Sequence, residues 1–345
     1  MSLEERLARV LEAHFDPRWG APWWLARARE LGFDPRREIR SEAELVRLPA
    51  IPREALSTLP VEAFVPLRHH GSRHDWIVSE TGGTTGPPCR TVFLPEEFEA
   101  AFVTPFVEAA RRVGFPRERS WLFVGPSGPH VIGKAARACA RALGAMDPFA
   151  VDLDPRWVRR LAPGSLARRR YTEHVVAQAL AVLESQDVGV LFATPPLLAA
   201  LGERLPEVVR ERITGVHLGG MAADAGFFAR LSDEWFPHAV ALSGYGNSLA
   251  GVCLQVEAVG PRGPEYFPHG DRLRLDVLDV DASGRGRVQF HRLDQGAFLP
   301  NVRERDEAAP AKRARDGDDD RFAERGIRDP RPPADPAEAP REGLY

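Results

Sequence analysis

The segment Ser79–Cys89 has the sequence Ser-Glu-Thr-Gly-Gly-Thr-Thr-Gly-Pro-Pro-Cys and follows a short apolar run typical of a strand. Glycines such as Gly83 and Gly86 allow positive φ angles and a close approach of the backbone, so successive N–H groups can point at one anion. Thr84 and Thr85 add hydroxyl donors. This composition predicts a loop that binds nucleotide phosphate, and a plain turn between a strand and a helix is the alternative.

A second glycine-containing loop, from Gly128 to Lys134, fits the Gly-x-x-x-x-Gly-Lys pattern of phosphate-binding P-loops. Ala135, however, stands where the P-loop has the serine or threonine that reaches Mg²⁺, and Pro129 removes one backbone N–H donor. We therefore expect an ordinary loop, with Lys134 at the exposed start of a helix.

The segment Gly246–Ala250 (Gly-Asn-Ser-Leu-Ala) is similar to the Gly-x-Ser-x-Gly elbow that presents the nucleophile of serine hydrolases. That elbow requires a helix directly after the serine, whereas the Val-Cys-Leu-Gln-Val-Glu run that follows favours a strand. A serine hydrolase using Ser248 is therefore the most distant hypothesis. Four histidines are available as its base: His217, His238, His269 and His291.

The residue types that commonly bind metals do not form a recognisable site. His69, His70 and His74 lie close together, but their spacing with Asp75 does not match a metal-binding helix face. The three cysteines lie far apart and form no Cys-x-x-Cys pair, so neither a zinc site nor a disulfide framework is expected. The sequence therefore predicts no metal site made by protein side chains alone.

Composition and charge exclude several classes of function. The 345 residues carry a formal net charge of −3, without the basic excess expected of a dedicated nucleic-acid-binding protein. No apolar run approaches the ~18 residues of a membrane-spanning helix, and the charged N-terminus lacks the apolar core of a secretion signal. With the cysteine usage, this predicts a cytoplasmic protein without nucleic-acid or membrane partners.

The elements that must position these residues fall into four regions. We expect residues 1–75 to form a helical segment packed on the main domain. From 76 to 250, short buried strands alternate with helices, which predicts an α/β core with a mostly parallel sheet. Residues 251–310 are strand-rich and predict a smaller β-type subdomain. The charged, proline-rich residues 311–345 predict a mostly mobile polar tail.

Taken in order, these segments resemble the adenylate-forming superfamily of acyl-CoA synthetases, nonribosomal adenylation domains and luciferases, and in particular its phenylacetate-CoA ligase branch. Gly83–Pro88 resembles the phosphate loop of that family, and Gly219-Gly220-Met221 resembles its adenine-contacting stretch. Tyr245–Leu249 resembles the Tyr-Gly-x-Ser/Thr-Glu motif. The resemblance implies a large α/β domain with a smaller β-rich subdomain.

Two further segments extend the resemblance toward the C-terminus. Gly286–Val288 resembles a glycine-led strand motif of the family. Arg303–Asp306 resembles an Arg-x-Arg-Asp segment whose aspartate holds the ribose hydroxyls. The resemblance covers about residues 20–310.

The activity that the resemblance implies is ATP-dependent activation of a carboxylic acid to an acyl-adenylate. Thr84, Thr85 and Ser248 are implied to act on phosphate at the reacting centre. The residues implied to bind nucleotide are Gly83, Thr84, Thr85, Gly86, Gly219, Gly220, Met221, Tyr245, Gly246, Arg303, Arg305 and Asp306. Loops at the strand ends are expected to line the acid pocket, with Ser127, Gly128, His130, Thr194, Pro195, Gly244 and Asn247.

The chain departs from the family pattern in three places. Pro87 occupies the position of the phosphate-loop lysine, and Leu249 that of the glutamate that helps to hold Mg²⁺. The sequence also ends too soon after Asp306 for the C-terminal lid domain with its catalytic lysine, so a short form without the lid is expected. ATP is the expected cofactor, with Mg²⁺ as an addition held by phosphate oxygens, water and Ser248.

Two hypotheses follow from these motifs. The first is an enzyme that adenylates an aromatic carboxylic acid in a biosynthetic pathway and passes it to CoA, a downstream reductase or a carrier protein. The second is a non-catalytic relative that binds a nucleotide or aryl acid, or scaffolds a partner. The Thr-Thr-Gly loop, Tyr245 and Asp306 favour the first, whereas Pro87, Leu249 and the expected lack of a lid favour the second.

Overall fold

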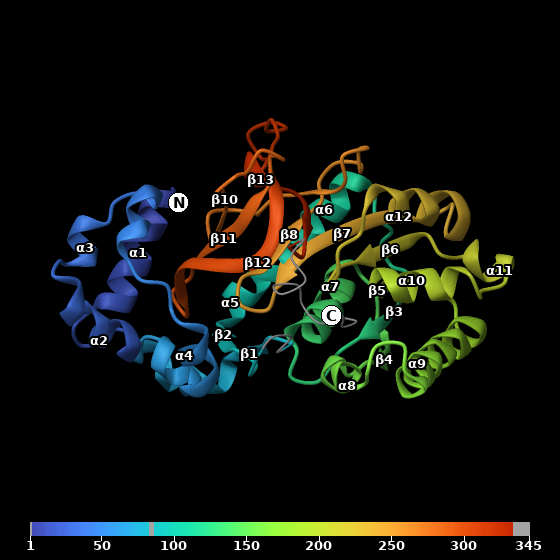
Figure 1. Ribbon diagram of the computed structural model, residues 1–345, viewed down its shortest axis with the longest axis horizontal. Helices are drawn as coiled ribbons and strands as arrows, with labels where there is room; N and C mark the ends of the chain where they lie inside the picture. Colours follow the sequence, from blue (N-terminus) through green and yellow to red (C-terminus); the bar gives the residue numbers. More distant parts are fainter. Residues whose placement is uncertain (1, 83–85, 334–345) are drawn as a thin grey trace.

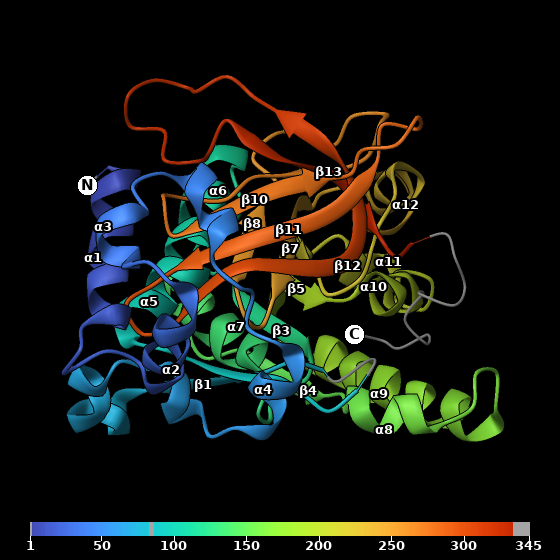
Figure 2. The ribbon, with the colours of Figure 1, turned by 60° about the vertical axis from the view of Figure 1, so that its left-hand side comes forward.

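The computed structural model describes residues 2–82 and 86–333. The chain forms a group of N-terminal helices, a six-stranded sheet with helices on both faces, and a five-stranded antiparallel sheet. In Figure 1 the N-terminal helices lie on the left, the six-stranded sheet on the right and the antiparallel sheet between them; Figure 2 shows the same arrangement turned by 60°. The mixed α/β class expected from the sequence is confirmed. Within the described residues, no helix combines the length and apolar character needed to cross a membrane.

The six-stranded sheet has the order β4-β3-β5-β6-β7-β8, and all neighbouring pairs except β7 and β8 are parallel. Every residue of the central strand β5 is buried. A continuous buried run of this kind is typical of parallel strands that are covered on both faces. The strands are β3 (Ser120–Gly125), β4 (Phe149–Asp152), β5 (Val188–Ala193), β6 (Gly215–Leu218), β7 (Val240–Asn247) and β8 (Gly251–Leu254).

Alternate side chains of the central strands enter two separate cores, because successive strand residues point to opposite faces. In β3, Leu122 and Val124 join a core covered mainly by α9, α10 and α12, while Trp121 and Phe123 join a core covered by α6 and α7. The helices of this region are α5 (Pro95–Phe98), α6 (Thr104–Val113), α7 (Val131–Ala142), α8 (Pro155–Arg160), α9 (Leu166–Ser185), α10 (Pro195–Gly202), α11 (Glu207–Arg210) and α12 (Ala225–Arg230).

The antiparallel sheet has the order β10-β11-β12-β13-β9. Its longest strand, β12, contains the Arg-x-Arg-Asp segment and pairs with both β11 and β13. A separate hairpin of two strands, β1 and β2, flanks the predicted phosphate loop. The strands are β1 (Ile77–Glu80), β2 (Arg90–Phe93), β9 (Glu265–Tyr266), β10 (Leu273–Leu278), β11 (Gly286–Leu293), β12 (Phe298–Lys312) and β13 (Arg325–Arg331).

The expectation of a mobile tail from residue 311 is wrong for the described part of that segment. Strand β13 pairs with β12 and β9, and both Phe322 and Ile327 are almost completely buried. The carboxylate of Asp320 lies 2.5 Å from Arg313 Nη2 and 2.8 Å from Arg112 Nη2. The acidic run that suggested disorder therefore contains an aspartate that is paired inside the fold.

The N-terminal helices pack on the antiparallel sheet through one shared core. Leu7 and Leu11 are one helical turn apart, which places both on the buried face of α1. The indole Nε1 of Trp24 donates to the carbonyl oxygen of Phe298 at 3.2 Å. The helices are α1 (Leu3–Phe15), α2 (Pro22–Leu31), α3 (Pro35–Glu38) and α4 (Arg53–Thr58), and short 3-10 segments continue to Asp75.

A buried network of charges joins the two large sheets. Arg272 Nη2 and Arg292 Nε lie 2.5 and 2.6 Å from the same carboxylate oxygen of Asp294. The two guanidinium groups also donate to successive backbone carbonyls of the turn after β7, Arg292 to Leu249 at 3.0 Å and Arg272 to Ala250 at 2.7 Å. The turn that carries the Tyr-Gly-x-Ser motif is thus fixed from the antiparallel sheet.

Candidate functional site

The predicted site residues come together at the carboxyl edge of the parallel strands. The neighbouring strands β3, β5, β6 and β7 run in the same direction, so the segments that follow them lie side by side at one edge of the sheet. In open α/β sheets this edge is where ligands bind. The candidates at this edge are Ser127, Gly128, His130, Thr194, Pro195, Gly219, Gly220, Met221, Gly244, Tyr245, Gly246 and Asn247.

The segment after β3 is held by the end of β4. The backbone N–H and the hydroxyl of Ser127 both donate to Asp152 Oδ1, at 2.9 and 2.7 Å. His130 is buried at the start of α7, and burial together with the charge of Arg156 lowers the pKa of its imidazole. His130 is therefore a neutral group at neutral pH, while Gly128 beside it is exposed.

The segment after β5 places a hydroxyl at this edge, and the segment after β6 places a glycine backbone close to the next strand. Thr194 is completely buried, and among the described residues its hydroxyl has no hydrogen-bond partner. A Cβ atom on Gly219 would lie 3.0 Å from the carbonyl oxygen of Gly244, so a larger residue would crowd the next strand. Gly220 has a φ of 80°, which favours glycine. Met221, beside this turn, is exposed.

Tyr245 and Asp306 meet although they are far apart in the sequence and belong to different sheets. The Tyr245 hydroxyl donates to Asp306 Oδ2 at 3.1 Å. Burial raises the pKa of both groups, and the carboxylate of Asp306 further raises that of Tyr245. The pair lies where the second half of β7 approaches β12, so the Tyr-Gly and Arg-x-Arg-Asp segments are in contact.

A second contact between the same strands was not predicted from the sequence. Asn247 Nδ2 donates to Glu304 Oε1. Burial and the nearby carboxylate of Asp306 raise the pKa of Glu304 to about 7. No local signal identifies Glu304, because its partner lies on another strand and only the fold brings them together.

The two arginines beside Asp306 differ in their surroundings. Arg303 is exposed, whereas Arg305 is partly buried and its backbone carbonyl accepts a 3.1 Å hydrogen bond from Arg287 Nη1. Burial and the charge of Arg53 lower the pKa of Arg305. Arg305 also stabilises the carboxylate form of Asp306, against the effect of burial.

Ser248 is not placed as a hydrolase nucleophile. It lies in a turn that leads directly into β8, so the helix required after an elbow serine is absent at this position. Its carbonyl oxygen accepts a 2.5 Å hydrogen bond from the Ser79 hydroxyl. His217, one of the histidines considered as a base, is buried, and its ring centroid lies 4.8 Å from that of Phe106 and 4.2 Å from that of Phe192. Its Nδ1 lies 2.7 Å from the carbonyl oxygen of Leu242.

The P-loop-like segment also has another role. Helix α7 begins at Val131, so Gly133 lies inside the helix, where an added Cβ would lie 2.7 Å from the Cα of Ser127. Lys134 Nζ donates to the carbonyl oxygen of Val78 in β1 at 2.9 Å. Lys134 thus attaches α7 to the β1–β2 hairpin.

The predicted phosphate loop is described only at its two ends. Gly83, Thr84 and Thr85 lie outside the described residues. At the base of the loop, Thr81 and Cys89 exchange hydrogen bonds of 2.9 Å, and Gly86 is exposed. Within the described part of the chain, no group of three or more histidine, cysteine or carboxylate side chains is arranged to hold a metal ion.

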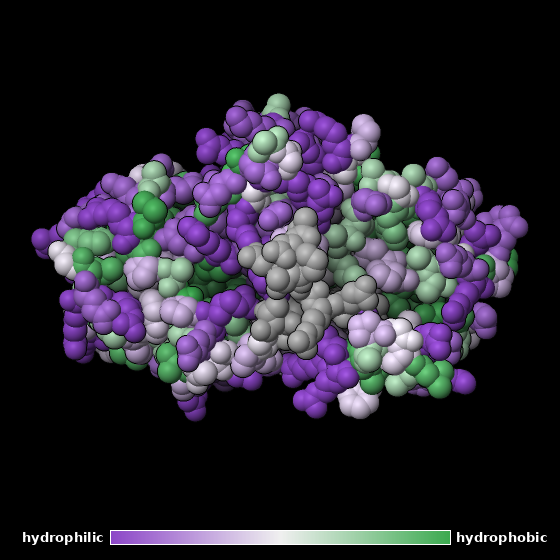
Figure 3. All heavy atoms as spheres, in the orientation of Figure 1, coloured by the Kyte–Doolittle hydropathy of each residue, from purple (hydrophilic) through white to green (hydrophobic). Residues whose placement is uncertain are grey.

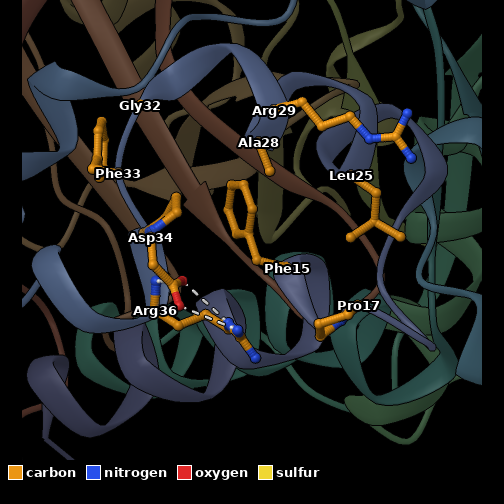
Figure 4. Close-up of a pocket in the computed structure, with 10 residues that line it drawn as sticks. Phe15, Pro17, Leu25, Ala28, Arg29, Gly32, Phe33, Asp34 and Arg36 are labelled. Atoms are coloured by element: carbon orange, nitrogen blue, oxygen red, sulfur yellow. Dashed lines mark hydrogen bonds and ion pairs between the residues drawn. The ribbon is translucent and has the colours of Figure 1, made fainter.

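A hollow of about 560 Å³ lies among the N-terminal helices, at the opposite end of the molecule from α11 in Figure 1. Figure 4 shows its apolar lining residues, including Phe15 and Phe33, together with the Asp34–Arg36 pair, in which Arg36 Nε donates to Asp34 Oδ1 at 3.2 Å. Figure 3 shows hydrophobic residues over these helices in small areas among hydrophilic ones. None of the predicted site residues lines this hollow.

Comparison with known proteins supports the fold. Protein-family models and curated protein sequences give no match to this chain. Among solved structures it is similar to an open conformation of 2-hydroxyisobutyryl-CoA ligase in complex with 2-HIB-AMP and CoA, with a TM-score of 0.63, 17% identity and coverage of 96% of this chain and 72% of that one. The thioesterification state of that ligase, with the same two ligands, gives a TM-score of 0.60, 17% identity and coverage of 95% and 66%.

The postadenylation state of the ligase, in complex with 2-HIB-AMP, gives a TM-score of 0.60 at 16% identity. In two of these three structures, the chain spans 66% of the length of the ligase. The low identity limits the likeness to the fold. This chain therefore shares the fold of 2-hydroxyisobutyryl-CoA ligase over nearly its whole length.

Proposed function

We propose that this protein activates a carboxylic acid, using ATP, to an acyl-adenylate at the carboxyl edge of the parallel sheet. The observation that carries the proposal is the contact between Tyr245 and Asp306 at 3.1 Å. It joins two of the nucleotide motifs in one place, beside the segments that follow β3, β5 and β6. The fold shared with a ligase that was solved in complex with 2-HIB-AMP supports the proposal that this protein forms an acyl-adenylate.

In the proposed reaction, a carboxylate oxygen of the acid forms a bond to the α-phosphorus of ATP. The bond from that phosphorus to the bridging oxygen breaks, and its electron pair leaves with pyrophosphate. The protein has to hold two anions in line and stabilise the charge that develops on the phosphate oxygens. We assign the ribose hydroxyls to the Asp306 carboxylate and the adenine to the ring of Tyr245 and the Gly219-Gly220 turn.

The acid is proposed to be aromatic and to bind near Thr194 and His130. The buried hydroxyl of Thr194 is a polar group that lacks a partner among the described residues, so a ligand oxygen at this place would satisfy it. His130 is neutral and donates or accepts without adding charge. We propose CoA, a carrier protein or a reductase as the acceptor of the activated acid.

The test is to measure ATP binding by calorimetry for the wild type and for Asp306→Ala. Loss of two charge-assisted hydrogen bonds should cost ~2–4 kcal/mol, or roughly thirty- to thousand-fold in affinity, at an unchanged melting temperature. Asp306→Asn should fall between the two, and exposed Asp318→Ala should bind normally. An Asp306→Ala protein that melts early but binds ATP normally would assign the carboxylate to a structural role instead.

One observation favours the second candidate, a non-catalytic binder. Leu249, at the position of the metal-binding glutamate in the family, is 1% exposed and belongs to the apolar core around the N-terminal helices. A chain with this residue lacks one carboxylate of the expected Mg²⁺ shell. Exchange of labelled pyrophosphate into ATP, measured with a panel of aryl acids, separates the two: a catalyst supports exchange, whereas a binder shows calorimetric binding alone.

A further inference from the structure

Two arginines of the short helix α8, Arg156 and Arg159, lie beside the base of the predicted phosphate loop. They are three residues apart, which places them on neighbouring positions of one helical turn. The turn is fixed, because Val158 is fully buried and the Asp154 carboxylate accepts from the backbone N–H of Arg156 at 2.8 Å. Neither arginine was singled out by the sequence motifs.

Both guanidinium groups contact the last described residues before the loop. Arg159 Nη2 donates to the carbonyl oxygen of Gly82, and Arg156 Nη2 donates to Glu80 Oε1. Glu80 also lies 3.4 Å from Arg90 Nε, so one carboxylate is shared by two arginines. The positive groups on this side of the hairpin therefore outnumber the carboxylates that they contact.

The electrostatics of this cluster point to an anion. Arg159 and Arg156 contact Gly82 and Glu80, two residues apart in the chain, so the two positive groups lie close together. Burial and the charge of Arg156 lower the pKa of Arg159, while the Asp154 carboxylate acts in the opposite direction. The nearby imidazole of His130 is neutral and contributes no charge. A cluster of this kind gains stability when a multiply charged anion binds, because guanidinium groups pair well with phosphate oxygens.

We propose that Arg159, supported by Arg156, binds the β- and γ-phosphates of ATP and replaces the positive charge that the phosphate-loop lysine would supply at Pro87. The proposal rests on the proposed function and deepens it, because these phosphates leave as pyrophosphate. Arg159 would then stabilise the charge that develops on the leaving group. The residues that carry the inference are Gly82, Glu80 and the two arginines, all of which lie in the described part of the chain.

The experiment compares ATP and AMP binding in wild type, Arg159→Gln, Arg159→Lys and Arg160→Gln. Arg159→Gln should weaken ATP binding by about 10- to 100-fold and AMP binding by less than about threefold, because AMP lacks the two outer phosphates. Arg159→Lys should recover part of the loss. Arg160 is exposed on the same helix and serves as the matched control, with unchanged binding expected.

The salt dependence provides a second readout. If Arg159 neutralises phosphate, the decrease of ATP affinity with rising salt should be shallower in Arg159→Gln than in the wild type. Equal losses for ATP and AMP would show that Arg159 only supports the Gly82 backbone, and unchanged ATP binding would likewise overturn the proposal. Either result leaves the proposed function intact if Asp306→Ala still loses binding of ATP and AMP. A wild-type protein that binds neither nucleotide would overturn the proposed function together with the role of Arg159.

Discussion

The two large sheets are stabilised in different ways. The parallel sheet is packed on both faces by apolar side chains such as Leu122, Phe123 and Leu191. The antiparallel side of the molecule holds most of the buried charge, in the Arg272–Asp294–Arg292 network and the Arg313–Asp320 pair. Apolar packing depends on the total volume and pattern of side chains, while a buried ion network depends on each member.

This difference affects the site directly. The parallel sheet contributes backbone turns and small residues at its carboxyl edge, whereas β12 contributes the carboxylates Glu304 and Asp306. The charge network connects the two, since Arg292 and Arg272 bind the backbone of the turn after Tyr245 and Asn247. The alignment of the motifs across the two sheets therefore depends on buried ions.

The largest expected effect tests the ion network. Burial alone would raise the pKa of Asp294, but Arg272 and Arg292 hold it below its ordinary value. Asp294→Ala removes the carboxylate that the two buried guanidinium groups share, leaving only Glu97, among the described carboxylates, at 3.6 Å from Arg292, and should lower the free energy of unfolding by about 3–5 kcal/mol. Urea denaturation measures this loss. The exposed Asp319→Ala should change stability by less than ~0.5 kcal/mol, and a similarly small change for Asp294→Ala would remove the contrast between the sheets.

An intermediate effect is expected in β13, which lies between β12 and β9 in the antiparallel sheet. Ile327 in β13 is completely buried, so Ile327→Ala should destabilise the protein by ~2–4 kcal/mol through lost apolar contact and a residual cavity. Differential scanning calorimetry checks the prediction. Arg325→Ala, on an exposed position of the same strand, is the control. A melting temperature unaffected by Ile327→Ala would mean that β13 is dispensable.

A third effect concerns the pH dependence of the site. The pKa of Glu304 is raised from 4.5 to about 7 by burial and by Asp306. The folded protein then binds more protons than the unfolded chain between these values, so stability falls as pH rises through this window. Glu304→Gln should remove this part of the slope. Because each unit of pKa shift corresponds to about 1.4 kcal/mol, the variant should gain up to ~3 kcal/mol at pH 8 relative to pH 4. The prediction would be wrong if the free energies of unfolding of the two proteins changed with pH in the same way between pH 4 and pH 8.

The parts of the molecule that the sequence predicted are those with local signals. The buried run of β5 and the glycine turn at Gly219 and Gly220 follow from residue type and spacing. The order of the motifs assigned Tyr245 and Asp306 to one nucleotide site, and their direct contact was found only in the structure. These features depend on neighbours in the sequence or on a pattern shared with known proteins.

The features that were missed depend on distant partners. The acidic run that ends at Asp320 suggested disorder, whereas Asp320 pairs with Arg313 and with Arg112, which lies far away in the sequence on α6. Glu304 meets Asn247, and Arg159 meets Gly82, only once the sheets and α8 have assembled. Hydropathy and spacing carry no information about such pairs.

Strand β7 has a consequence for how this protein can vary in length. Its eight residues pair in parallel with β6 up to Ser243 and then antiparallel with β8 from Gly244. Since side chains alternate along a strand, inserting one residue before Gly244 would turn Tyr245 to the opposite face and away from Asp306. The length of β7 therefore fixes the position of Tyr245 relative to the antiparallel sheet. We expect insertions to be tolerated in loops such as 256–264 and not within β7.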